Sequence, residues 1–338
     1  MLNQYLSAIA ASLQEWSWPN LEARDGLRLV VLIVFVLLVL WEAGAACRRA
    51  RARVTRQSYL SNLAVMLAND TVLSLLAVSS LWHLADRYGQ AGLLEGVENP
   101  VVKAALALLV LDLALYGWHW ACHHCDWLWR FHRVHHSDVT MNVSTAFRLH
   151  IVELLLTTLL KAVTVVVFGI NSALLLLSET LLTLLVMFHH ANVRFGAEST
   201  LGRVFIVPAL HRVHHSRLRE EHDSNYGAAF SFWDRLFGTL REAEPVALGL
   251  RGVGEQSWWE TVRYGFSPLA PSLAPQLHVM IAEAAYFRAE KRGFEPGWEV
   301  SDWIEAEREI LTQSGHRKHR QRAGAGRSGK LQWCLLPR

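Results

Sequence analysis

The chain has 338 residues, of which 52% are hydrophobic and 19% are charged, and its formal net charge at pH 7 is +3. The large apolar fraction excludes a disordered chain, and a content of only 21 Gly and 9 Pro excludes a collagen-like one. Four irregularly spaced cysteines do not form a disulfide framework, and because the positive charge is localised we expect no nucleic-acid partner.

The first expected element is a membrane-spanning helix at residues 29–47. This segment is rich in Leu, Val and Ile and contains a single charged residue, Glu42. About 20 apolar residues are enough to cross a bilayer as a helix. Five arginines follow between Arg48 and Arg56, and such clusters stay on the cytoplasmic side. Because the positive block follows the apolar run, we expect a retained anchor rather than a signal peptide.

Further apolar runs predict more membrane helices. Residues 59–85 and 101–122 are expected to be the second and third crossings, which return the chain to the cytoplasmic side. The runs at 151–168 and 170–188 predict a helical hairpin that enters from that side and returns to it, either spanning the bilayer or dipping into it. From residue 191 onward no segment is apolar enough to cross.

The histidines are concentrated in one part of the chain. Thirteen of the 17 lie between His119 and His222, and neutral imidazole is a common metal ligand, so this concentration indicates a metal site. Spacings of three and four residues keep imidazoles on one side of a helix. The motifs with such spacing are His119-Trp-Ala-Cys-His123, His132-Arg-Val-His135-His136 and His211-Arg-Val-His214-His215, and His189-His190 ends the expected hairpin.

The number of imidazoles bears on the number of metals. The pair and the two triads supply eight, whereas a zinc ion takes about four ligands, so we expect two metals, or one metal with additional histidines nearby. Asp112 lies two helical turns before His119, and an acid in a membrane helix needs a partner, so we expect a ligand histidine to bond to it. His83, His222 and His278 are not expected to be ligands.

Imidazole suits both zinc and iron, so the ligand type leaves the reaction open. A metal cluster at the base of a lipid-facing bundle favours an oxygenase that attacks an inert C–H bond of a lipid, because that substrate arrives through the bilayer. One alternative is a zinc-dependent membrane hydrolase, which would normally place a general-base Glu among the ligands. Another is a membrane metal-binding or transport protein, whose ligands would follow a path through the bilayer.

The order, spacing and flanking residues of these motifs resemble the fatty acid hydroxylase superfamily, and within it the bacterial sterol desaturase-like proteins. The resemblance covers residues 105–242 and includes the segments Tyr116-Gly-Trp-His119, Leu128-Trp-Arg-Phe-His132, His150-Ile-Val-Glu153, Phe188-His-His190-Ala-Asn192, Asn225-Tyr-Gly227 and Trp233-Asp-Arg-Leu-Phe237. It implies a membrane-embedded enzyme that holds two iron ions and uses O2 and external electrons to hydroxylate or desaturate a sterol, fatty acyl or related lipid.

Carried over position by position, the resemblance implies these iron ligands: His119, His123, His132, His135, His136, His190, His211, His214 and His215. In the family a histidine often stands four residues before the position of His190. This chain has Val186 there, so His150 and His189 are the candidates for an additional ligand. The expected hydrogen-bond partners around the ligands are Asp112, Asn192, Asp223 and Asn225.

We therefore predict an all-α protein, an integral-membrane helical bundle with a cytoplasmic helical cap that carries a histidine-rich dimetal site. Its expected parts are N-terminal transmembrane helices (1–100), a fatty acid hydroxylase-like catalytic domain (101–242), a C-terminal cytoplasmic helical region (243–315) and a basic disordered tail (316–338). No G-x-G-x-x-G fingerprint is present, so we expect a separate electron-transfer protein as partner. The expected location is the bacterial inner membrane, with the site on its cytoplasmic face.

Overall fold

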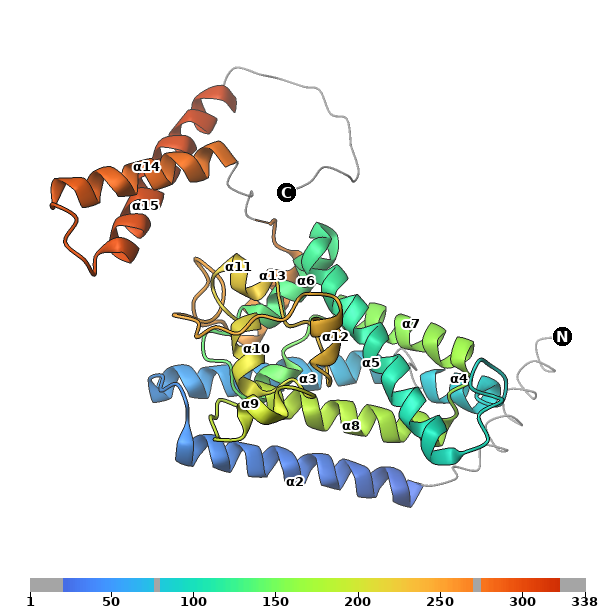
Figure 1. Cartoon of the computed structure of the whole chain (residues 1–338). Coiled ribbons are helices and arrows are strands. Elements are labelled where there is room, and N and C mark those ends of the chain that lie inside the picture. Colours follow the sequence, from blue (N-terminus) through green and yellow to red (C-terminus); the bar gives the residue numbers. More distant parts are fainter. Residues whose placement is uncertain (1–20, 76–79, 270–274, 323–338) are drawn as a thin grey trace. The chain divides into compact units, whose positions relative to one another are not determined.

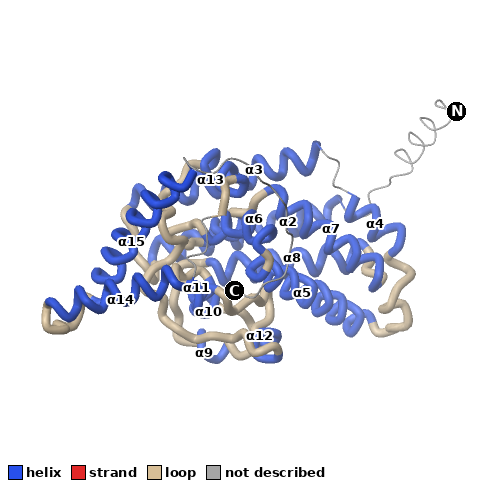
Figure 2. Tube along the Cα trace, turned by 90° about the horizontal axis from the view of Figure 1, so that it is seen from above, coloured by secondary structure: helices blue, strands red, loops and turns tan. Residues whose placement is uncertain are grey.

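The computed structural model describes residues 21–75, 80–269 and 275–322, and it divides after Pro268 into two compact units (Figure 1). Within these ranges every regular element is a helix, and the only strand-like pairings are two isolated bridges (Figure 2). The predicted all-α class is therefore confirmed.

The first unit contains the larger part of the helices. They are α2 (Leu21–Ala45), α3 (Ala52–Leu75), α4 (Ser80–Tyr88), α5 (Pro100–His124), α6 (Asp126–His136), the 3₁₀ helix η1 (Val143–Phe147), α7 (Ile151–Phe168), α8 (Ser172–His190), α9 (Glu198–Leu201), α10 (Pro208–His214), α11 (Arg219–His222), α12 (Phe232–Leu236) and α13 (Trp258–Phe266).

Four of these helices are long and apolar enough to cross a membrane, namely α2 from Asp25 onward, α5, α7 and α8. The expected crossing at 59–85 is not among the candidates found in the described residues, and positions 76–79 of it lie outside that part of the chain. Its described residues are divided between α3 and α4, and the buried face of α3 is mostly polar, with Ser58, Asn62 and Asn69. Buried polar groups need hydrogen-bond partners, so the face of a helix that carries them packs against protein rather than lipid. α3 accordingly packs against η1 and α13.

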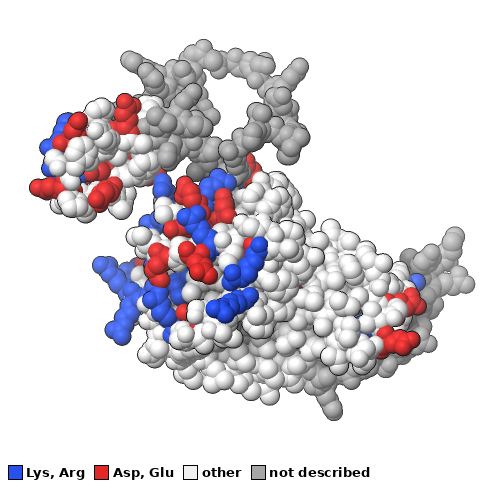
Figure 3. All heavy atoms as spheres, in the orientation of Figure 1, with Lys and Arg blue, Asp and Glu red and all other residues white. Residues whose placement is uncertain are grey.

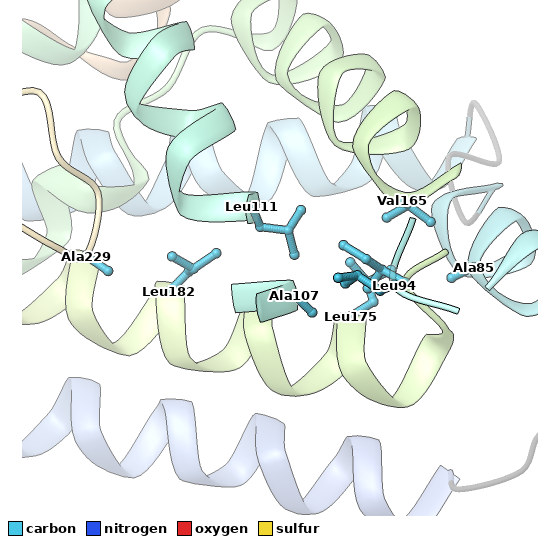
Figure 4. Close-up of a cluster of buried hydrophobic side chains, with 9 residues drawn as sticks. Ala85, Leu94, Ala107, Leu111, Val165, Leu175, Leu182 and Ala229 are labelled. Atoms are coloured by element: carbon cyan, nitrogen blue, oxygen red, sulfur yellow. The ribbon is translucent and has the colours of Figure 1, made fainter. Parts of the chain in front are cut away.

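The helical hairpin is present as predicted, because the residues between its arms suit a tight turn. Gly169 ends α7 in the left-handed conformation, with φ of 66°, where a side chain would be strained. Asn171 caps α8 by accepting a hydrogen bond from the Leu174 N–H at 2.9 Å. Inside the hairpin Lys161 pairs with Glu179 at 2.7 Å. Leu111 of α5 packs against both arms in a buried apolar cluster, together with Val165 and Leu182 (Figure 4).

A buried carboxylate, Asp138, connects the end of α6 to α3 and η1. It accepts hydrogen bonds from Ser58 Oγ at 2.7 Å, Asn62 Nδ2 at 2.9 Å and Thr145 Oγ1 at 2.8 Å. Burial alone would raise the pKa of Asp138, but the charge of Arg148 and these hydrogen bonds hold it below its usual value. The network therefore keeps a buried charge that fixes the chain two residues after His136.

Arg148 completes this network from the other side. Its guanidinium donates to the Val134 carbonyl at 3.0 Å, to Asn62 Oδ1 at 2.9 Å and to Gln256 Oε1 at 2.6 Å. Because Val134 precedes the histidine pair of α6, the same network holds the helix end on both sides of that pair.

Glu42, the single charged residue of the first apolar run, is buried at the end of α2. It accepts hydrogen bonds from the Val143 N–H at 2.8 Å and the Asn192 N–H at 2.5 Å, and Tyr59 donates to its other oxygen. Asn192 in turn bonds to both backbone groups of Arg48. The lipid-facing helix α2 is thus joined to η1, α3 and the residues that follow α8.

The second unit is a helical hairpin of α14 (Pro275–Lys291) and α15 (Glu299–Arg322). Ile281, Ala285, Ala306 and Ile310 form its small core. Residues 316–322, expected to begin a disordered tail, are the last turns of α15. Residues 323–338 and the side chain of His278 lie outside the described part of the chain.

Replacing Asn62 tests the polar network. The Asn62→Ala variant leaves Asp138 and Arg148 without one of their buried partners, so we expect a loss of about 1–3 kcal/mol in unfolding free energy. Thermal unfolding in detergent, followed by circular dichroism, measures the change. Thr71→Ala is the control, because Thr71 is exposed on the same helix and bonds only to the Leu67 carbonyl. Equal midpoints for the two variants would contradict the role of the network.

Candidate metal centre

The nine histidines expected as ligands lie together at the ends of α5, α6, α8 and α10. They form two sets, and within each set every residue offers a nitrogen within 4.8 Å of the others. The five-histidine set comprises His119, His123, His132, His136 and His214, and the four-histidine set comprises His135, His190, His211 and His215. All except His119 are buried, so two neighbouring positions are surrounded by imidazole inside the protein.

The Nδ1 atoms of five of these rings face groups that only accept hydrogen bonds. His119, His190 and His214 contact the carbonyls of Tyr226 at 2.8 Å, Val186 at 2.7 Å and Ser224 at 2.6 Å. The other two contact carboxylates: His123 lies 3.1 Å from Asp223 and His132 lies 2.6 Å from Glu153. Because the partner only accepts, the proton lies on Nδ1 and the lone pair on Nε2.

The Nε2 atoms are turned toward one another. His136 Nε2 lies 3.1 Å from that of His123 and 3.2 Å from that of His132. In the other set His190 Nε2 lies 3.0 Å from that of His135 and 2.9 Å from that of His211. His123 and His132 carry their protons on Nδ1, so both present Nε2 lone pairs toward His136, and a cation can lie among these nitrogens.

These spacings match metal coordination. Imidazole nitrogen binds a metal at about 2.1 Å, so two nitrogens at right angles around it are about 3.0 Å apart. Burial lowers the pKa of His135, His136 and His215 well below the usual value, and the neighbouring histidines lower it further. The rings are therefore neutral at physiological pH, which is the form that binds metal. The residues fit a pair of metal ions.

The expected hydrogen-bond partners differ in how close they lie to the ligands. Asp223 bonds to His123 directly and also accepts from Arg219 at 2.9 Å. Asn225 has a positive φ of 54° and holds its loop to α10 by donating to the Leu210 carbonyl at 2.8 Å. Asn192 bonds to Arg48 and Glu42 rather than to a ligand.

Asp112 does not bond to a ligand histidine as expected. It accepts from the Ala229 N–H and from Trp233 Nε1, both at 2.8 Å. Seven residues of helix separate it from His119 by about 10 Å along the axis, which is beyond hydrogen-bond reach. Asp112 therefore fixes the loop whose Tyr226 carbonyl contacts His119.

Neither candidate for an additional ligand belongs to either set. His150 caps α7, where its Nδ1 accepts from the Val152 N–H at 3.2 Å, and its ring stacks on Phe131. His189 lies beside the four-histidine set, with its ring centroid 4.0 Å from that of His211. The Nδ1 of His150 is therefore already used to cap α7.

Two residues near the ligands were missed as contributors to the site. Glu153 bonds to His132, and the available signal was an acid in the first turn of an apolar helix. His222 was not expected to be a ligand and lies outside both main sets, but it forms a smaller group with His123 and Asp223. Its ring stacks on Trp129, and nothing in the motif spacing indicated that contact.

Comparisons with known proteins agree with this arrangement. Residues 104–239 match the family model described as fatty acid hydroxylase, and residues 276–312 match a family of proteins of unknown function (DUF2934). The chain is 31% identical to an ornithine lipid hydroxylase of Rhizobium tropici over 138 residues. This alignment covers 41% of each of the two chains. It is 31% identical to an alkylglycerol monooxygenase of Caenorhabditis elegans over 42% of this chain and 28% of that one.

A third relative is the cholesterol 25-hydroxylase of Mus musculus, 29% identical over 45% of this chain and 50% of that protein. The chain thus spans half or less of the length of these relatives. No solved structure matches it significantly. The matched residues contain all nine clustered histidines with their motifs in order, so residues 104–239 are similar to the fatty acid hydroxylase family.

Proposed function

We propose that this protein is a membrane-embedded di-iron oxidoreductase that hydroxylates or desaturates an unactivated C–H bond of a lipid. The observation that carries the proposal is the convergence of ring nitrogens from nine histidines into two adjacent sets. Relatives named for ornithine lipid, alkylglycerol and cholesterol support a lipid substrate. The bound iron pair supplies the oxidising chemistry with O2; for hydroxylation one oxygen atom enters the lipid and the other leaves as water, with two electrons and two protons supplied from outside.

The protein residues have three roles in this proposal. The histidines bind the metals, and the carbonyl and carboxylate partners fix the ring orientation before metal arrives. Burial of eight of the nine rings limits access of water to the reacting position. The apolar helices α5 and α8 end beside the histidine sets and α7 begins there, so a lipid can approach from the bilayer without crossing water.

A zinc-dependent hydrolase is less well supported. Such an enzyme needs a carboxylate that is free to take a proton from water. Glu153 and Asp223, the acids in contact with the ligands, each bond to a ligand Nδ1 and so act as orienting groups. A transporter is also less well supported, because the histidines gather at the helix ends instead of following a path through the bilayer.

The membrane orientation follows from the arginines. Arg48 bonds to Asn192, two residues after the ligand His190, and the exposed side chains of Arg49, Arg51 and Arg53 follow. Most charged side chains lie at one end of the first unit, a smaller and mainly acidic group lies at the other end, and most of the face over the long helices is uncharged (Figure 3). Because arginine-rich loops remain on the cytoplasmic side, we place the metal centre at the cytoplasmic face of a bacterial inner membrane, where a separate electron-transfer protein can reach it.

Removing one ligand tests the metal chemistry. The purified wild-type protein is expected to contain two irons per chain and to form an oxidised lipid when O2 and electrons are supplied. His135→Ala removes a ligand of the four-histidine set, so we expect no more than one tightly held iron and at least about a hundredfold loss of product.

Elemental analysis measures the iron in this experiment and mass spectrometry measures the lipid product. His83→Ala is the control, because His83 is exposed on α4 and should retain both irons and full activity. Stoichiometric zinc without oxygen consumption would instead favour the hydrolase.

Cysteine labelling tests the orientation. In a background without native cysteines, Arg51→Cys and Glu95→Cys place single thiols on exposed residues that flank opposite ends of the helices. A membrane-impermeant maleimide should label Glu95→Cys in intact cells and Arg51→Cys only after the membrane is opened. The reverse pattern would place the metal centre outside.

A further inference from the structure

The two histidine sets differ in size, although they lie side by side. Five imidazoles surround one position, whereas four surround the other. Neighbouring rings such as those of His135 and His136, with centroids 5.5 Å apart, belong to different sets. The two positions therefore share one buried environment, so a difference between them must come from the ligands themselves.

The carboxylates add to this difference. Glu153 and Asp223 both contact rings of the five-histidine set, His132 and His123. In the four-histidine set the ring with an assigned Nδ1 partner, His190, bonds to a neutral carbonyl. The Nδ1 atoms of His135, His211 and His215 are buried without a protein partner, and in the five-histidine set the same holds for His136 alone. A carboxylate partner makes an imidazole a stronger donor to metal than a carbonyl does, so one position has more ligands and also better donors.

The four-histidine set has one imidazole fewer than the other set, and we assign the position of the missing imidazole to α8. Val186 lies one turn before His190, so their side chains share a face of the helix. Its carbonyl orients the His190 ring, but its side chain carries no donor and packs against the apolar cluster that contains Val143 and Met187. His189 does not replace the missing donor, because it lies outside the set.

We infer that the two metal positions are not equivalent: the four-histidine position binds its metal more weakly and leaves one more coordination position to a non-protein ligand. The inference rests on the proposed dimetal function and assigns Val186 as the residue that causes the difference. Glu153 and Asp223 are positioning residues that strengthen the five-histidine position.

Metal release from the full-length protein measures the difference. Protein loaded anaerobically with Fe(II) is mixed with excess 2,2′-bipyridine, and the absorbance of the iron complex is followed. We expect two phases of one metal each in the wild type. Val186→His adds a donor to the smaller set, so it should slow the fast phase at least about tenfold and leave the slow phase unchanged.

Three variants control this result. Val186→Leu adds no donor and should change neither phase, and His189→Gln should also change neither. Glu153→Gln weakens the support of His132, so it should speed the slow phase about tenfold and leave the fast phase unchanged. Because the effects of Val186→His and Glu153→Gln fall on different phases, either variant decides the question if the other fails to fold.

The outcomes separate this inference from the proposed function. A single phase that releases both metals, or a Glu153→Gln effect confined to the fast phase, overturns the inference. If the wild type holds only one metal, its loss in His119→Ala but not in His135→Ala supports the inference, and the opposite result overturns it. The same phases can be followed with zinc and a zinc-binding dye, so they do not depend on oxygen chemistry or on lipid product.

Discussion

The arrangement of this protein depends on one repeated interaction, the hydrogen bond from a histidine Nδ1 to a fixed acceptor. Each such bond chooses the tautomer of a ring and turns its Nε2 lone pair toward the interior. The assigned lone pairs point into the two histidine sets, where a cation can accept them. The helices, the loop at 223–230 and the buried network around Asp138 all serve to hold these acceptors and rings in place.

The acceptors come from elements far apart in the sequence, which explains how much of the site could be predicted. Eight of the nine clustered histidines lie in short motifs with helical spacing, the family resemblance added His190, and their binding of metal stays a prediction. Glu153 and the carbonyls of Tyr226 and Ser224 reach the ligands only through tertiary packing. A backbone carbonyl carries no sequence signal, and an acid at a helix start has many other uses.

The fold shows the same limit. Long, mostly apolar runs predicted α2, α5, α7 and α8, because helices that contact lipid expose apolar side chains. Residues 59–85 were also apolar on average, yet α3 buries Ser58 and Asn62 against Asp138 and Arg148. Average hydropathy does not report which face of a helix is buried. For the same reason Asp112 could be recognised as needing a partner, while the partner itself, the loop at 229–233, could not.

The bond between Glu42 and the backbone of Asn192 has a mechanical consequence. A membrane helix adjusts its tilt when the thickness of the surrounding bilayer changes. The carboxylate of Glu42 fixes the end of α2 to the chain just beyond His190. Any rotation of α2 must therefore either break that bond or move the residues that follow α8.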